Sequence, residues 1–75
     1  MFEELKNIIV EYVTVKVEEI TLESKLVEDL GLNSYEFMSL VGRIEEEYDI
    51  EVDEREVVKI KTVGEVIDYI NTLKK

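Results

Sequence analysis

The sequence predicts an all-α fold, an irregular four-helix bundle with a long first loop and a short third helix. Apolar residues recur at helical spacing in separate stretches, and the single alternating run has no second strand to pair with. With 75 residues the chain has room for one domain, covering residues 1–75. It contains no Cys and no His, which excludes disulfides and Cys/His zinc sites as sources of stability. Packing between helices must therefore stabilise a thin core.

The first helix is expected over residues 2–13, where apolar side chains recur every three or four positions. The β-branched run 13–17 resembles a strand locally, but it has no partner, so we expect the helix to enter a long connection there. Residues 14–33 form this connection. Its spaced leucines predict a loop pinned to the core, with one helical turn near 24–30. Gly31 then permits a turn with positive φ.

The second helix is expected from residue 34 to residue 48 and has the clearest signals. Asn33 is a good N-cap, and Glu36 three residues later can complete a capping box. Gly42 lies inside this helix at a cost of about 1 kcal/mol relative to alanine. The helix carries an apolar stripe made of Phe37, Leu40, Val41, Ile44 and Tyr48.

Two further helices are expected toward the C-terminus. Residues 54–59 suffice for a short third helix, after a connection over 49–53. Thr62 is expected to cap the last helix, and Lys74 and Lys75 suit its C-terminal end. The buried side of that helix is predicted to consist of Val63, Val66, Ile67, Ile70 and Leu73.

The net charge restricts the partners of the chain. Nine Lys and Arg stand against 19 Asp and Glu, a formal charge of −10. This balance argues against binding to nucleic acid, which requires cations, and favours protein partners with basic surfaces. No apolar run reaches the roughly 18 residues of a membrane span, and the chain does not start like a signal peptide. We therefore expect a cytoplasmic protein.

Composition also argues against an enzyme. Without Cys and His the chain lacks a thiol nucleophile and an imidazole base, so no catalytic residue is expected. The acidic tract 45–54 does not match a calcium loop, because Glu54 replaces the turn glycine and Ile60 the bidentate glutamate. We expect no dedicated metal site there, only loose binding of divalent ions.

Ser34 is the candidate for chemistry done on the protein. Its hydroxyl is predicted at the first turn of the second helix, where amide donors and the helix dipole favour a phosphate ester. On its own, an Asn-Ser pair at a helix start indicates capping and nothing more.

The segment around Ser34 resembles the acyl carrier protein motif, in which a Leu-Gly-x-Asp-Ser-Leu segment presents a modified serine. Residues 30–40 read LGLNSYEFMSL, and the likeness continues over 44–52, 62–70 and, upstream, 20–30. The resemblance implies a four-helix bundle whose Ser34 receives 4′-phosphopantetheine from coenzyme A through a phosphopantetheinyl transferase. The arm would hold acyl intermediates as thioesters in fatty-acid, polyketide or related biosynthesis.

The resemblance also implies roles for other residues. Asn33 and Tyr35 would flank the attachment point, and the implied partners are acyl-transferring, ligating and condensing enzymes with basic docking surfaces. A monomer is expected. The residues implied to contact partners are Glu36, Met38, Glu45, Glu46 and Val52. The residues implied to line an acyl pocket are Ile44, Tyr48, Val52, Ile60, Val66 and Tyr69.

Four positions depart from the family pattern. Asn33 replaces the usual Asp, Tyr35 replaces the usual Leu, and Ser39 and Gly42 replace an acid and a larger apolar residue. These departures predict partners other than those of a housekeeping fatty-acid carrier. Two alternatives remain open: an aminoacyl or peptidyl carrier using the same serine, and an unmodified helical adaptor. The first differs in the acid that is loaded, and the second in whether Ser34 is ever modified.

Overall fold

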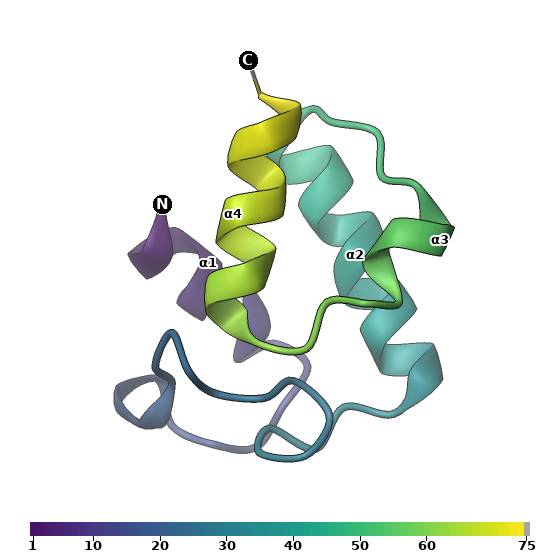
Figure 1. The fold of residues 1–75 in the computed structure, drawn as a ribbon. Helices are drawn as coiled ribbons and strands as arrows, with labels where there is room; N and C mark the ends of the chain where they lie inside the picture. The colour runs from purple at the N-terminus through teal and green to yellow at the C-terminus, as the bar shows by residue number, and fades with distance from the viewer. Residues whose placement is uncertain (75) are drawn as a thin grey trace.

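The computed structural model describes residues 1–74 and confirms the all-α fold class. Within these residues it contains helices and turns and no strand. The elements in chain order are α1 (Phe2–Ile9), the 3₁₀ turn η1 (Val17–Glu19), α2 (Ser34–Tyr48), α3 (Glu54–Val57) and α4 (Val63–Leu73) (Figure 1).

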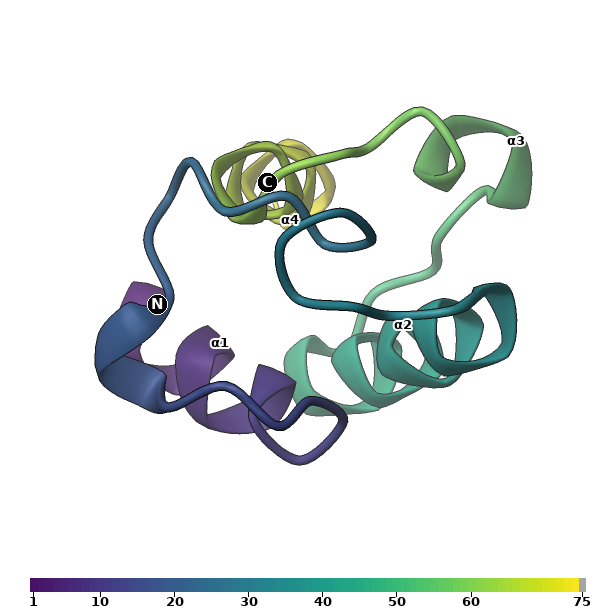
Figure 2. The ribbon, with the colours of Figure 1, turned by 90° about the horizontal axis from the view of Figure 1, so that it is seen from below.

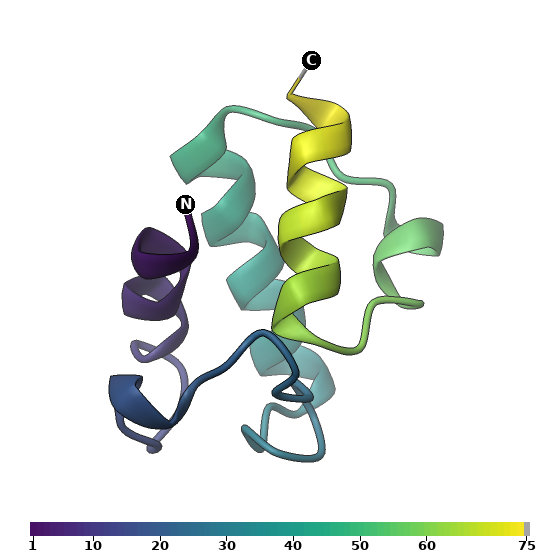
Figure 3. The ribbon, with the colours of Figure 1, turned by 60° about the vertical axis from the view of Figure 1, so that its left-hand side comes forward.

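The three longer helices form the body of the molecule. α2 and α4 run in the same direction and α1 runs the opposite way, while the short α3 lies on the far side from α1 (Figures 1 and 3). The long loop between α1 and α2 crosses the end of the bundle at which α2 and α4 begin (Figure 2). That end therefore brings together the start of α2, the loop and the connection from α3 to α4.

The core draws on the loop as much as on the helices. Ile20, Leu26, Leu30 and Leu32 of the loop are buried, as the spaced leucines predicted. Leu22 is an exception, because its side chain is 49% exposed. The helices add buried side chains from α1, α2 and α4, among them Leu5, Ile9, Leu40, Ile44, Val63 and Ile70.

Backbone hydrogen bonds tie this loop to the start of α4. The N–H of Leu26 donates to the carbonyl of Lys61 (2.8 Å), and the N–H of Gly64 donates to the carbonyl of Leu22 (2.8 Å). The N–H of Leu32 in turn donates to the carbonyl of Leu26 (3.1 Å). We call these three bonds the loop strap. They hold the residue just before the α2 cap at a fixed place relative to α4.

Side-chain caps begin both α2 and α4, as predicted. The N–H of Glu36 donates to Asn33 Oδ1 (2.7 Å), and the N–H of Asn33 donates to Glu36 Oε1 (3.1 Å). Thr62 and Glu65 form the equivalent pair on α4. Both capping boxes satisfy N–H groups that have no partner inside a helix. Gly31 has φ +79°, which confirms the turn expected before α2.

Two helices are shorter than predicted. α1 ends at Ile9, and the chain continues through a tighter turn in which the N–H of Tyr12 donates to the carbonyl of Ile9 (2.9 Å). The β-branched residues that follow have low helix propensity, which explains the early end. α3 likewise ends at Val57 and is followed by a tighter turn, in which the N–H of Lys59 donates to the carbonyl of Glu56 (3.1 Å).

The loop contains two further turns. The expected turn near 24–30 is present, because the N–H of Asp29 donates to the carbonyl of Lys25 (2.9 Å), but it does not continue into a helix. The 3₁₀ turn η1 was not predicted. At the other end of the chain Lys74 follows α4 as its C-cap, and Lys75 lies outside the described residues.

Two helical glycines provide a matched test of the loop strap. A Cβ at Gly42 would meet no heavy atom within 4 Å, whereas one at Gly64 would lie 3.1 Å from the carbonyl oxygen of Leu22. Gly42→Ala should therefore raise the free energy of unfolding by about 1 kcal/mol. Gly64→Ala should raise it less or lower it, because the new methyl group pushes on the strap. Urea titrations measure both; equal gains would show that the loop moves aside freely.

Acid should weaken the cap of α4. The pKa of Glu65 lies below its ordinary value because its carboxylate accepts hydrogen bonds from the N–H groups of Lys61 and Thr62. A lowered folded-state pKa stabilises the protein above the ordinary pKa, and this contribution is lost as the pH falls through the lowered value. Below pH of about 4.5, Tm should thus fall more steeply in the wild type than in Glu65→Gln.

Asp68→Asn controls for the loss of one charge on the same helix. If Glu65→Gln and Asp68→Asn follow the same curve of Tm against pH, the cap of α4 does not depend on the ionised carboxylate.

Candidate functional site

Ser34 is the first residue of α2 and is exposed. Asn33 and Glu36 already satisfy the cap of the helix, so the Ser34 hydroxyl is not needed for it. α2 has 15 residues, and the N–H groups of its first turn give this end a partial positive charge. The Ser34 oxygen therefore lies in a position that favours a bound anion.

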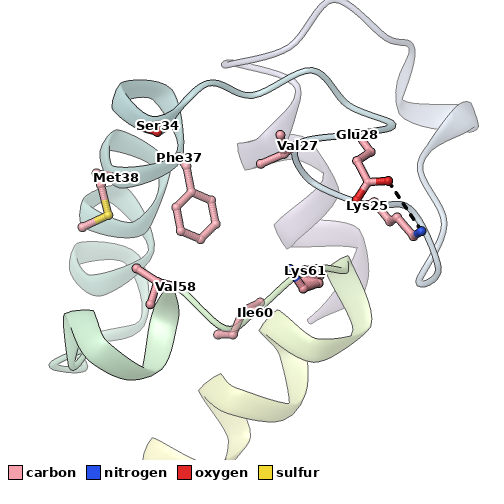
Figure 4. Close-up of a pocket in the computed structure, with 9 residues that line it drawn as sticks. All are labelled: Lys25, Val27, Glu28, Ser34, Phe37, Met38, Val58, Ile60 and Lys61. Carbon is pink, nitrogen blue, oxygen red and sulfur yellow. Dashed lines mark ion pairs between the residues drawn. The ribbon is translucent and has the colours of Figure 1, made fainter.

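A pocket of about 310 Å³ opens beside Ser34 (Figure 4). This volume falls in the range of small-molecule sites, roughly 300–1,000 Å³. Its walls come from the loop, from α2 and from the connection between α3 and α4. We call it the Ser34 pocket, and the residues lining it are Lys25, Val27, Glu28, Ser34, Phe37, Met38, Val58, Ile60 and Lys61.

One bond of the loop strap joins two walls of the Ser34 pocket. Leu26, between the wall residues Lys25 and Val27, donates its N–H to the carbonyl of Lys61 on the opposite wall. A backbone hydrogen bond thus links the loop wall to the wall formed by the α3–α4 connection. The sequence patterns did not predict Lys25, Val27, Val58 and Lys61 at this site, because only the folded loop brings them near Ser34.

A second, smaller cavity lies inside the bundle between α2, α3 and α4. Its volume is about 20 Å³, close to the space of a single water molecule. Phe37 and Ile60 line both this cavity and the Ser34 pocket, so their side chains form a wall between the two. Five of the six residues predicted for an acyl pocket line the cavity: Ile44, Val52, Ile60, Val66 and Tyr69.

The sixth, Tyr48, is not among the residues lining the cavity. Its ring lies 5.4 Å from the ammonium of Lys74, at the far end of α2 from Ser34. Burial, followed by the charges of Glu4 and Glu47, raises the pKa of its phenol. Its buried hydroxyl has no hydrogen-bond partner within the described residues.

The side chains predicted to meet partners have different environments. Glu36 Oε1 accepts a hydrogen bond in the cap of α2, and Glu45 Oε2 accepts one from the N–H of Val52 (2.9 Å). Val52 is half-buried and lines the inner cavity. Glu46 is exposed, and Met38 is 38% exposed at the edge of the Ser34 pocket. Of these five residues, only Glu46 and Met38 are exposed.

The two residues that flank Ser34 also differ. The Asn33 side chain is occupied by the capping box, whereas the Tyr35 side chain is 80% exposed. Tyr35 is thus the large apolar group that stands freest beside the Ser34 hydroxyl.

Residues 1–74 contain neither a cluster of metal ligands nor a helix suited to span a membrane. The described side chains include no group of three or more His, Cys, Asp or Glu that could hold a metal ion, so the acids of 45–54 do not converge on one point. None of the described helices combines the length and the apolar character needed to cross a membrane.

Comparisons with known proteins agree with this geometry. A family model described as the phosphopantetheine attachment site matches residues 3–70. The chain is 45% identical to the acyl carrier protein of Wolinella succinogenes, covering 99% of this chain and 97% of that one. It is 36% identical to the acyl carrier protein of Campylobacter fetus, covering 100% and 97%.

A solved structure shares the fold. The acyl carrier protein from Enterococcus faecalis superposes with a TM-score of 0.83 at 26% identity, covering 96% of this chain and 91% of that one. The sequence and structural matches both extend over almost the whole chain. The chain belongs to the family of acyl carrier proteins, which carry acyl groups on phosphopantetheine.

Proposed function

We propose that Ser34 is the residue that bears the phosphopantetheine arm. The observation that carries this proposal is the exposed hydroxyl at the first turn of α2, opening into the 310 Å³ Ser34 pocket. In the transfer, Ser34 Oγ attacks the phosphorus next to pantetheine in coenzyme A. A new phosphodiester forms, adenosine 3′,5′-bisphosphate leaves, and a base on the transferase takes the hydroxyl proton.

The start of α2 suits the phosphodiester that results. The N–H groups of its first turn favour the negative charge of the phosphate. The N-cap residue Asn33 is a neutral amide and adds no repulsion of its own beside that phosphate. The arm supplies a thiol, which this chain lacks, and the acyl cargo is held there as a thioester.

The acyl chain would occupy the inner cavity in an expanded form. At about 20 Å³ the cavity is too small for more than one water, so cargo requires neighbouring elements to separate. α3 is the element suited to move, because it has four residues. A side-chain hydrogen bond from the Tyr69 hydroxyl joins it to α4. That hydroxyl donates to Glu56 (2.8 Å) and accepts from the N–H of Asp53 (3.1 Å).

The wider function follows from the family and the charge. We propose that the chain is a single carrier domain without catalysis of its own, working as a monomer in the cytoplasm. Its formal charge of −10 suits transferases and synthases with basic docking surfaces. Of the predicted contacts, we place Glu46 and Met38 in the interface, since both are exposed on α2. The named relatives carry acyl groups, which favours an acyl over an aminoacyl cargo.

Replacing Ser34 should abolish loading. With coenzyme A and a broad-specificity phosphopantetheinyl transferase, the wild type should gain the mass of one phosphopantetheine and Ser34→Ala should gain none. Ser39→Ala, a second serine on α2, is the matched control and should load normally. Intact-protein mass spectrometry measures all three. If Ser34→Ala is still loaded, another residue is the attachment site. An unmodified wild type would favour the adaptor alternative.

Neighbouring glutamates of α2 should differ in what they affect. Glu46→Gln should lower kcat/KM of the transferase by roughly twofold to fivefold, the effect of one exposed charge pair, without changing Tm. Glu45→Gln should lower the free energy of unfolding by about 1 kcal/mol, because the N–H of Val52 loses a charged acceptor. Steady-state kinetics and thermal melts separate the two. If Glu46→Gln leaves kcat/KM unchanged, Glu46 is not part of the docking surface.

A further inference from the structure

The helix that covers the inner cavity contributes little apolar surface of its own. Of the four residues of α3, only Val57 is buried, and its side chain lines the inner cavity. Glu54, Arg55 and Glu56 are exposed. A second contact is polar and comes from Tyr69 of α4, which lines the same cavity. One apolar anchor and one tyrosine therefore hold α3 in place.

The Tyr69 hydroxyl holds α3 at two points. It donates to Glu56 Oε1 (2.8 Å) and accepts from the N–H of Asp53 (3.1 Å), the N-cap residue of α3. One oxygen atom on α4 thus joins the beginning of α3 to its third residue. Burial is the main cause that raises the pKa of the Tyr69 phenol, so the hydroxyl keeps the proton that it donates. Because its acceptor is a carboxylate, the bond to Glu56 is the stronger of the two.

The chain is fixed on both sides of α3. Before α3, the N–H of Val52 donates to Glu45 Oε2 on α2 (2.9 Å). After α3, the carbonyl of Lys61 accepts the N–H of Leu26 from the loop. Figures 1 and 3 show α3 outside the body formed by the three longer helices. A short segment between two fixed points can therefore move away from the cavity while the rest of the fold stays in place.

We propose that α3 is a lid over the inner cavity and that the Tyr69 hydroxyl is its latch. When both hydrogen bonds of the hydroxyl break, α3 lifts and an apolar molecule can enter. The closed cavity, at about 20 Å³, has room for one water molecule, so entry depends on this opening. The inference deepens the proposed use of the cavity and rests on it. Tyr69 in this way sets how often the cavity is open.

Thiol labelling can measure the opening of the lid. The chain contains no cysteine, so a single introduced thiol reports on one place. Val57→Cys places a thiol under the lid, and Val63→Cys places one in the core of the bundle, away from the cavity lining. A buried thiol reacts with an aromatic disulfide reagent only when the structure around it opens. The Val57→Cys protein should react faster than the Val63→Cys protein, because lifting of α3 exposes only the first thiol.

Variants in the Val57→Cys background assign the latch to one hydroxyl. Tyr69→Phe loses two hydrogen bonds and should raise the labelling rate by roughly 5-fold to 150-fold. Tyr48→Phe is the matched control and should not raise the rate, because that hydroxyl has no partner among the described residues. Glu56→Gln should give a smaller increase, since a neutral amide accepts a weaker bond. Glu54→Gln, an exposed acid on the same helix, should give none.

Xenon binding can measure entry into the cavity. Xenon occupies dry apolar cavities, and its atom is larger than a water molecule, so it needs the open form. Binding through a minor open state gives an apparent affinity proportional to the population of that state. In a protein with the native Val57, Tyr69→Phe should therefore raise the xenon affinity by about the same factor as the labelling rate. Methyl resonances of Ile44 and Val66, which line the cavity, report the binding by NMR.

The outcomes separate the lid, its latch and the route into the cavity. Equal labelling rates for Val57→Cys and Val63→Cys would show that α3 opens only with the whole bundle, which overturns the lid. An unchanged rate in Tyr69→Phe would overturn the latch. Faster labelling without a gain in xenon affinity would overturn the route. All these measurements use the protein without its arm, so a failure here leaves the loading of Ser34, measured by intact mass, unaffected.

Discussion

The hydrogen bond from the N–H of Leu26 to the carbonyl of Lys61 is the contact on which the site depends. It joins a loop of more than twenty residues to the start of α4, in a chain without disulfides. Through the carbonyl of Leu26 the same residue holds Leu32, the last buried side chain before the α2 cap. The position of Ser34 relative to the α3–α4 connection thus follows from backbone groups, and among single substitutions only a proline at a donor position removes such a group.

The acids of α2 show how a strongly charged chain divides its charges between two uses. Glu36 and Glu45 accept backbone N–H groups and stabilise the cap and the 49–53 connection. Glu46 has no such role and faces solvent. Electrostatic attraction at long range depends on the sum of these charges, whereas the fit to one partner depends on the few that are free. The number of acids therefore indicates how strongly a partner is attracted at long range, but not which residues form the interface.

Local signals in the sequence account for the elements that were predicted well. The bounds of α2 follow from the capping pair Asn33 and Glu36 and from the apolar stripe, whose members recur every three or four residues. The residues of the inner cavity were reached through family resemblance and lie where helices meet. In contrast, the far wall of the Ser34 pocket depends on hydrogen bonds between residues about 35 positions apart. No periodicity or capping pattern encodes that contact.

Other differences between the predicted and the observed structure also arise because local patterns do not encode tertiary contacts. Tyr48 continues the apolar stripe of α2, but periodicity does not say which neighbour covers each end of a helix. Its ring lies near Lys74 and Glu4 and not at the cavity. Glu45 and Glu46 are indistinguishable in the sequence, and only the return of the chain at Val52 separates them. α1 ends early because the residues after Ile9 have low helix propensity, although apolar residues continue at helical spacing.

The four residues of α3 have a consequence for how the molecule opens. An isolated helix of this length is unstable in water, so α3 exists only while Val57 is buried and the Tyr69 hydroxyl bridges Asp53 and Glu56. Segments with so few contacts open at a free energy far below that of global unfolding. The amide hydrogens of α3 should thus exchange with solvent by local opening, while those of α2 and α4 should exchange only when the whole bundle unfolds. The element that covers the cavity is in this way also the one whose unfolding disturbs the rest of the fold least.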